Sequence, residues 1–293
     1  MMHSKTFSWL EAALSSHFGQ HITILKCTPL SGGSIHKATK VETSVGTFFV
    51  KHNTVQHHEN FLAEADGLAC LRATHTFAVP ETILVGATDH EAFLVLQYIE
   101  QGAASPTFWE RFGEHLALLH RHSAAQFGYK QHNFIGALPQ QNTWHRRWSE
   151  FFIEERLRPM LQRAHQASLL SSHEAKRVER LFPALESFFP DEPPALLHGD
   201  LWSGNFLVNS EGLPVLFDPA VYFGHREAEI AFMHLFGGFS ERLFHAYHGV
   251  FPLAPQWRTR LEVFNLYPLL VHLNLFGRSY WSAIERTLRR FAP

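Results

Sequence analysis

The sequence predicts an α+β protein in which an N-terminal antiparallel sheet of five strands with one helix precedes a mainly helical region. Short apolar runs separated by Gly and Ser turns fill the first part of the chain, as is typical of strands and hairpins. Most later segments repeat apolar residues every three or four positions, which is the period of an amphipathic helix. Gly102, Ser105 and Pro106 interrupt regular structure between the two regions, so we expect two domains, 1–100 and 101–293.

The apolar patterns give each element an expected range. A short helix is expected at 9–18, and a longer helix at 60–73 interrupts the strands. Strands are expected at 22–25, 40–42, 47–51, 82–85 and 93–97. In the second region, helices are expected at 148–164, 173–188, 227–236 and 256–275, and over the stripe of Phe108, Phe112, Leu116 and Leu119. The segment 205–218 has the strand, turn, strand pattern of a hairpin.

Composition and charge narrow the class of protein. The 45% hydrophobic and 18% charged content is typical of a chain that folds completely. The net charge of −2 and the absence of a long basic run argue against a nucleic-acid partner. The start of the chain lacks the pattern of a signal peptide, and no apolar stretch is long enough to cross a bilayer, so we expect a cytoplasmic protein without a membrane partner. Cys27 and Cys70 are too few for a disulfide framework, and both a monomer and a homodimer are compatible with the sequence.

Three polar residues on and beside the predicted hairpin have the spacing that phosphoryl transfer from magnesium–ATP requires. Asp200 would orient or deprotonate the attacking hydroxyl, while Asn205 and Asp218 would hold Mg²⁺ against the phosphates. Protein kinases place an Asn five residues after the catalytic Asp and a magnesium-binding Asp beyond the following hairpin, which is the order found here. Asp200 alone, after a Gly, is equally typical of a turn cap, and only the combination of three residues favours catalysis.

The first region supplies residues that could hold ATP. A strand ends at Lys51, which could bind the α- and β-phosphates, and Glu64 on the next helix could fix that lysine. Each residue taken alone is more typical of an exposed position. A turn with two glycines could cover the nucleotide, although such glycines are structural as often as functional, and the end of the last strand could meet adenine. The nucleotide-binding candidates are Lys51, Glu64, Gly32, Gly33, Ser34, Gln97, Tyr98 and Ile99.

These residues together predict a two-lobed, protein-kinase-like fold, with 1–100 as the ATP-binding lobe and 101–293 as the catalytic and substrate-binding lobe. Gly199 stands where protein kinases have an Arg that reads a phosphorylated segment. Asp218-Pro219-Ala220 replaces the Asp-Phe-Gly motif of protein kinases. Both differences favour a small-molecule kinase over a protein kinase.

Several motifs resemble the fructosamine kinase (ketosamine-3-kinase) family, part of the wider aminoglycoside and choline phosphotransferase group, over nearly the whole chain. The most specific are Leu197-His-Gly-Asp-Leu-Trp-Ser-Gly-Asn205 and Phe217-Asp-Pro-Ala-Val-Tyr-Phe-Gly-His-Arg-Glu227, followed by Leu235-Phe-Gly-Gly-Phe239. Leu273-Asn-Leu-Phe-Gly277 is a further match. The resemblance implies ATP- and Mg²⁺-dependent phosphorylation of the sugar 3-hydroxyl of a ketosamine, either a small molecule or protein-bound. The phosphorylated product decomposes, so the family is viewed as a deglycation repair system.

The resemblance also implies roles for individual residues. Asp200 would be the base, Asn205 and Asp218 the magnesium ligands, and Lys51 with Glu64 the groups that position ATP. The acceptor pocket would contain Trp202, Tyr222, His225, Arg226 and Glu227. Trp202 is equally compatible with a core or interlobe anchor, and Arg226 with Glu227 is equally compatible with an ion pair that supports the catalytic loop.

Two rival functions stay open at this point. A kinase for aminoglycosides, choline or another small alcohol would use the same Asp200, Asn205 and Asp218. A non-catalytic nucleotide-binding scaffold is disfavoured, because such proteins usually lose one of the residues that this chain keeps. Redox control through a cysteine in the glycine-rich turn, known in some family members, is not expected, since the turn has no Cys and Cys27 has the pattern of a packed residue.

Overall fold

The computed structural model describes residues 4–30 and 36–291, which form two compact units. The first, the sheet unit, contains residues up to 108 together with 204–219. The second, the helical unit, contains 109–203 and 220–293. We expected residues 101–293 to form one domain, whereas the contacts group the hairpin at 204–219 with the sheet. The functional roles of the two units remain a proposal.

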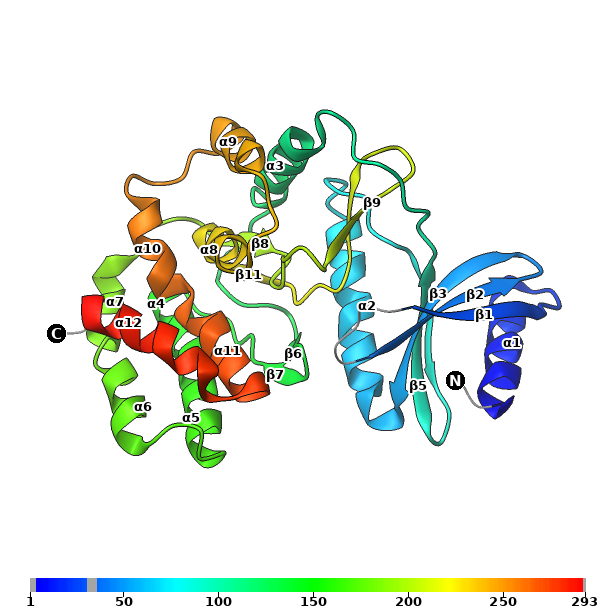
Figure 1. Ribbon diagram of the computed structural model, residues 1–293, viewed down its shortest axis with the longest axis horizontal. Helices are drawn as coiled ribbons and strands as arrows, with labels where there is room; N and C mark the ends of the chain where they lie inside the picture. The colour runs from blue at the N-terminus through cyan, green and yellow to red at the C-terminus, as the bar shows by residue number, and fades with distance from the viewer. Residues whose placement is uncertain (1–3, 31–35, 292–293) are drawn as a thin grey trace. The chain divides into compact units, whose positions relative to one another are not determined.

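The sheet unit contains the five antiparallel strands that the sequence predicts, in the order β1-β2-β3-β5-β4 (Figure 1). The helices are α1 (Ser4–Phe18) and α2 (His58–Arg72), with a short 3-10 turn at Val55–His57 before α2. The strands are β1 (Ile24–Leu30), β2 (Lys37–Thr43), β3 (Gly46–Thr54), β4 (Thr82–Ala87) and β5 (Glu91–Gln97). Most strands run further than predicted, because pairing with neighbours extends them beyond their apolar centres.

Alternation along β3 and β5 explains how the two helices cover opposite faces of the sheet (Figure 1). Val50 and Phe93 point to the face covered by α1 and pack with Leu10 in one buried cluster. Residues one position along each strand point the other way, toward α2. Lys51 therefore faces α2, and residues 92–96 of β5 are buried on both sides, as their continuous apolar run predicts.

The hairpin predicted at 205–218 is present as β9 (Phe206–Val208) and β10 (Pro214–Leu216). It joins the sheet unit through backbone bonds far apart in sequence. The N–H of Leu216 donates to the carbonyl of Ala78 at 3.1 Å, and the N–H of Gly102 donates to that of Val208 at 3.0 Å. These bonds fix the position of the segment that carries Asn205 and Asp218.

The helical unit is built on α3 (Phe108–Leu119), whose predicted stripe is fully buried. The following helices are α4 (Trp148–Phe151), a π-helix at Phe152–Leu157, α5 (Arg158–Gln166), α6 (Ser172–Glu179), α7 (Phe182–Phe188), α8 (Arg226–Phe236), α9 (Glu241–Val250), α10 (Trp257–Phe264), α11 (Leu266–Phe276), a 3-10 turn at Arg278–Tyr280 and α12 (Trp281–Phe291). Two short strand pairs complete it: β6 (Asn133–Ile135) with β7 (Leu138–Gln140), and β8 (Ala195–Leu197) with β11 (Tyr222–Gly224).

Three predicted helices are interrupted, and a proline explains each interruption. The ranges 148–164, 173–188 and 256–275 contain Pro159, Pro183 and Pro268. Proline cannot donate the i to i−4 hydrogen bond, so the chain starts a new helix at or just before it. Before Pro159 the chain also widens into the π-helix, which a proline-containing turn readily accommodates. The predicted single helices are therefore wrong at these points.

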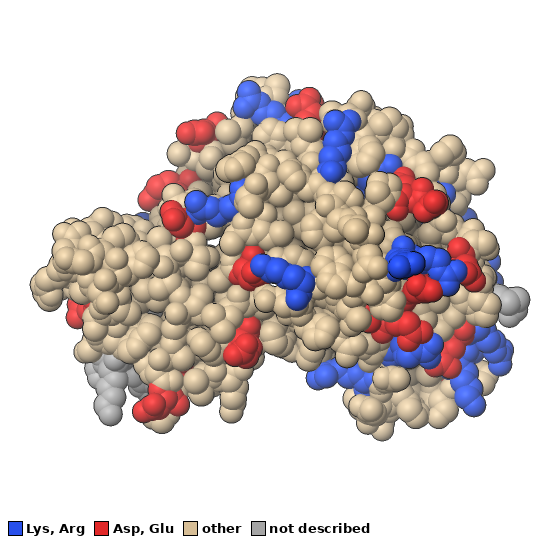
Figure 2. All heavy atoms as spheres, turned by 180° about the vertical axis from the view of Figure 1, so that it is seen from behind, with Lys and Arg blue, Asp and Glu red and all other residues tan. Residues whose placement is uncertain are grey.

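Surface charges are mixed in sign. On the face shown in Figure 2, Lys and Arg side chains lie among Asp and Glu side chains rather than in one basic area. Arg289 and Arg290 on α12 pair with Glu285 and Glu262 at 3.1 and 2.6 Å. Within the described ranges, every helix falls short of the length and apolar content that a membrane crossing needs.

Candidate functional site

Lys51 is the centre of a buried charge cluster in the sheet unit. Its Nζ lies 2.7 Å from Oε1 of Glu64, and it also forms an ion pair with Oδ1 of Asp218. The lysine is only 6% exposed, so its charge depends on these two carboxylates rather than on water. Residues from β3, α2 and the end of the β9–β10 hairpin thus meet at one cation.

Asn205 and Asp218 are tied together at the base of the hairpin. Asn205 Nδ2 donates to the carbonyl of Asp218 at 3.4 Å, and the N–H of Phe217 donates to the carbonyl of Asn205 at 3.1 Å. Asp218 has φ +56°, a left-handed conformation that costs a non-glycine residue about 1 kcal/mol or more and persists where surrounding contacts impose it. An amide and a carboxylate provide the hard oxygen ligands that suit Mg²⁺, which takes few protein ligands and completes its shell with phosphate and water.

The other nucleotide-binding candidates are only partly described. Gly32, Gly33 and Ser34 lie outside the described residues. Gln97 donates its N–H to the carbonyl of Glu81 at 2.8 Å, so this group belongs to the sheet. Tyr98 and Ile99, which follow β5, remain candidates for the adenine hinge, and the ring of Tyr98 lies 4.6 Å below the Lys40 ammonium.

Asp200 lies in the helical unit, just after β8, in a turn that requires glycine at position 199. Gly199 has φ +84°, and a Cβ there would lie 2.0 Å from the carbonyl oxygen of Ala220. The N–H of Ala220 in turn donates to the carbonyl of His198 at 2.9 Å. The Arg that protein kinases carry at this position therefore has no room in this backbone conformation.

Glu229 of α8 stabilises the turn that carries Asp200, and the sequence analysis did not single out this residue. Its carboxylate accepts the N–H groups of His198 and Gly199 at 3.1 and 2.7 Å, and His120 Nε2 lies 2.9 Å from it. Burial alone would raise the pKa of Glu229, but these hydrogen bonds and the neighbouring imidazole keep it below the ordinary value. His120 is positioned in turn by the Tyr247 hydroxyl, 2.8 Å from Nδ1. Glu229 is therefore a positioning residue for the Asp200 turn.

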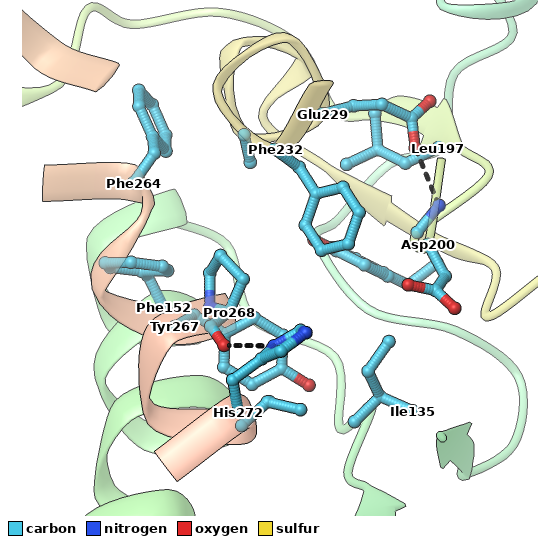
Figure 3. Close-up of a pocket in the computed structure, with 14 residues that line it drawn as sticks. Ile135, Phe152, Leu197, Asp200, Glu229, Phe232, Phe264, Tyr267, Pro268 and His272 are labelled. Atoms are coloured by element: carbon cyan, nitrogen blue, oxygen red, sulfur yellow. Dashed lines mark hydrogen bonds between the residues drawn. The ribbon is translucent and has the colours of Figure 1, made fainter. Parts of the chain in front are cut away.

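Asp200 also lines a small cavity of about 30 Å³ within the helical unit. Figure 3 shows its carboxylate directed into a space bordered by aromatic and apolar side chains. The other lining residues are Ile135, Phe152, Leu197, Gly199, Tyr222, Ala228, Glu229, Phe232, Phe264, Tyr267, Pro268, Val271 and His272. A cavity of this kind has room for at least one ordered water or a small polar group beside the carboxylate.

The five residues predicted for the acceptor pocket divide into two groups. Trp202 is 40% exposed, which fits a surface that meets a ligand better than a core anchor. Tyr222 is buried and lines the Asp200 cavity, with the Arg156 guanidinium 4.1 Å from the far side of its ring. These two remain acceptor candidates.

His225, Arg226 and Glu227 are placed elsewhere by the structure, because they are buried in supporting contacts and do not line the cavity. Arg226 forms a bidentate pair with Glu192, both bonds 2.7 Å long. Glu227 pairs with Arg260 at 2.6 and 2.7 Å. The ion-pair alternative for these residues, though with partners distant in sequence rather than with each other, matches the geometry.

A family model described as fructosamine kinase matches residues 6–292. The chain belongs to the fructosamine kinase family. A probable ketoamine kinase from Synechocystis sp. is 37% identical over 278 residues, which cover 94% of both chains. A probable ketoamine kinase from Enterococcus faecium is also 37% identical and covers 91% of this chain and 95% of its own. As a member of this family the protein is a kinase, an enzyme that transfers a phosphoryl group.

Solved structures agree with the fold. A Thermobifida fusca protein provisionally named a fructosamine-3-kinase superposes with a TM-score of 0.83 at 34% identity, covering 96% of this chain and 97% of that one. A thermostable mutant of the aminoglycoside phosphotransferase APH(4)-Ia has a TM-score of 0.66 at 14% identity over 96% and 98% of the two chains, which establishes likeness of fold only. The predicted protein-kinase-like fold is confirmed for this member of the fructosamine kinase family.

Replacing Glu229 tests its positioning role in this fructosamine kinase family member. Glu229→Ala leaves two backbone N–H groups without their acceptor, so we expect a loss of about 2–4 kcal/mol in the free energy of unfolding and a fall in kcat of about tenfold or more. Glu229→Gln keeps one acceptor oxygen, so its free energy of unfolding and kcat should lie between those of Glu229→Ala and the wild type. Urea denaturation and steady-state kinetics measure both, with Glu262→Ala on the surface as the control. A kcat for Glu229→Ala equal to that of the control would contradict the positioning role.

His225 predicts a pH dependence of stability. Burial lowers its pKa to about 4, although Glu192 opposes the shift, so the folded state holds the neutral form. In the unfolded chain the His225 imidazole takes up a proton near pH 6.5. The free energy of unfolding is therefore unaffected by this group above pH 6.5 and decreases as pH falls toward 4, by roughly 3 kcal/mol in total. His225→Asn keeps an N-cap acceptor for α8 and should reduce the loss of stability over that range, measured by thermal unfolding at several pH values. An unchanged pH profile in the variant contradicts this assignment.

Proposed function

We propose that this protein transfers the γ-phosphoryl group of ATP to the sugar 3-hydroxyl of a ketosamine, and that the unstable product gives it a role in deglycation. The observation that carries the proposal is Lys51, a buried ammonium held by Glu64 and Asp218. A strand lysine paired with a glutamate of the following helix is the arrangement that positions nucleotide phosphates in protein kinases. Its membership of the fructosamine kinase family points to the ketosamine acceptor.

On the nucleotide side, the proposal assigns a role to each residue of the Lys51 cluster. Lys51 contacts the α- and β-phosphates while Glu64 holds its ammonium in place. Asn205 and Asp218 would hold Mg²⁺, which would supply charge neutralisation on the phosphates.

On the acceptor side, Asp200 accepts the proton of the attacking sugar hydroxyl. The Gly199 turn and the Glu229 hydrogen bonds fix the backbone that carries it, so the carboxylate is positioned before substrate binds. Tyr222 and the apolar cavity wall exclude water from one side of the carboxylate. Trp202 offers an exposed ring to the sugar face.

Substitution of Asp200 tests this assignment. Asp200→Asn should lower kcat about 10²- to 10⁴-fold, because the amide cannot accept the hydroxyl proton, while the affinity for Mg²⁺–ATP stays within about twofold. Coupled-enzyme kinetics with a fructosamine acceptor and calorimetric titration with nucleotide give the two values. Asp191→Asn, at an exposed position, is the matched control. Turnover of Asp200→Asn at the wild-type rate would remove Asp200 from the base role, and turnover of aminoglycosides or choline alone would remove ketosamines as substrates.

A further inference from the structure

A continuous run of aromatic rings leads from the Asp200 cavity to the surface of the helical unit. We call Phe232, Phe236, His272, Phe276 and Tyr280 the aromatic strip. Phe232 and His272 line the cavity, and Phe236 links them with ring centroids 4.7 and 4.6 Å away. Phe276 and Tyr280 pack on His272 at 5.4 and 5.2 Å.

Exposure rises along the strip. Phe232 is 9% exposed at the cavity wall, whereas Phe276 at the outer end is 58% exposed. A single exposed phenylalanine is common on protein surfaces. Phe276 is more informative, because it ends a row of rings that starts at the cavity lined by Asp200. The strip thus presents apolar surface that begins at the cavity lined by Asp200 and becomes exposed at Phe276.

His272 stands where the cavity ends and the strip begins, and its hydrogen bond fixes its chemistry. Nδ1 lies 2.8 Å from the carbonyl of Pro268, which can only accept, so Nδ1 carries the proton. Burial lowers the pKa of the imidazole despite this bond, which favours the neutral ring. Nε2 is then an unprotonated acceptor, and Figure 3 shows the ring turned with this nitrogen away from Pro268. The position suits a ligand group that donates a hydrogen bond.

The charged groups that line the cavity are carboxylates. Asp200 and Glu229 line it, and no Lys or Arg is among the described residues that do. The Glu229 carboxylate accepts two backbone N–H groups and lies 2.9 Å from His120 Nε2. The nearest guanidinium with a printed contact, that of Arg156, lies 4.1 Å from the ring of Tyr222 and donates to Asn142 at 2.7 Å. Arg278, two residues before Tyr280, pairs with Glu174 at 2.8 Å.

A ketosamine has the group that this arrangement suits. Its amine is bonded to carbon 1 of the sugar, so the nitrogen lies about 4–5 Å from the 3-hydroxyl oxygen. The nitrogen is a secondary ammonium that donates hydrogen bonds, and its substituent points away from the sugar. Asp200, Phe232 and His272 line the same cavity, so a ketosamine with its 3-hydroxyl at Asp200 places its ammonium beside the residues at the inner end of the strip.

We propose that the aromatic strip binds the alkyl substituent of the ketosamine amine, and that Nε2 of His272 accepts a hydrogen bond from its ammonium. This inference rests on the proposed function and deepens it: the substrates are ketosamines of aliphatic amines rather than unsubstituted or neutral sugars. The rings of Phe276 and Tyr280 provide apolar contact for the alkyl chain. The shared chemistry, a secondary alkylammonium, occurs both in adducts of small amines and in a glycated lysine side chain.

Three acceptors that share one sugar separate the two contacts: N-methyl-fructosamine, N-butyl-fructosamine and the uncharged 1-O-butyl-fructose. Phe276→Ala should raise KM for the two butyl acceptors about fivefold to tenfold and leave KM for the N-methyl compound within about twofold. His272→Phe keeps the ring packing but removes the acceptor nitrogen, so it should raise KM for both amines about tenfold and spare the ether. The kcat values should stay near wild type in both variants.

Phe18→Ala, which truncates a phenylalanine of 40% exposure on α1, is the control and should change no KM. Equal effects of Phe276→Ala on the N-methyl and N-butyl acceptors, or of His272→Phe on amines and ether, would overturn the inference. Wild-type inertness toward all three acceptors would instead reject the proposed function. A lysine-glycated unfolded protein, tested as a further acceptor, distinguishes protein-bound from free ketosamines. If Phe276→Ala raises KM for the glycated protein as it does for N-butyl-fructosamine, the strip binds lysine side chains of proteins. If KM rises only for the small acceptors, the strip binds free adducts.

Discussion

The buried charge of Lys51 is the constraint on which the sheet unit depends. An ammonium with so little access to water needs carboxylate partners, and Glu64, whose side chain is only 11% exposed, is the more shielded of its two partners. Glu64 comes from α2 and Asp218 from beyond β10, so one cation connects a strand, a helix and a hairpin more than 150 residues further along the chain. This requirement explains why the hairpin packs with the sheet rather than with the helices that flank it in sequence. The same cluster is where the proposed function needs phosphate and Mg²⁺.

The helical unit also depends on a buried charge, in this case a negative one. Glu229 is a buried carboxylate that takes its partners from two backbone N–H groups and from His120. Behind it, a chain of polar contacts runs through Tyr247 to Arg226 and Glu192. Arg226 therefore supports the turn that carries Asp200 without lining the cavity. Two residues of the 217–227 motif therefore have different places: Tyr222 lines the cavity, and Arg226 belongs to the supporting contacts.

Local spacing made part of this predictable. Five strands followed from short apolar runs, and Lys51, Asp200, Asn205 and Asp218 followed from an order that phosphoryl transfer requires. Glu229 was not predictable, because its partners are backbone groups some thirty residues away and a Glu in an amphipathic helix gives no distinguishing signal. Glu227 likewise pairs with Arg260 across 33 residues. The helix breaks at Pro159, Pro183 and Pro268 did have a local signal, which apolar periodicity outweighed.

Phosphorus NMR of the reaction product tests the central claim most directly. Wild-type protein is incubated with Mg²⁺, ATP and N-methyl-fructosamine labelled with carbon-13 in the sugar. The account predicts one new phosphate monoester resonance, with its two-bond coupling to carbon 3, that appears in step with ADP. A monoester with its two-bond coupling to any other carbon, or release of inorganic phosphate without any sugar phosphate, would contradict it.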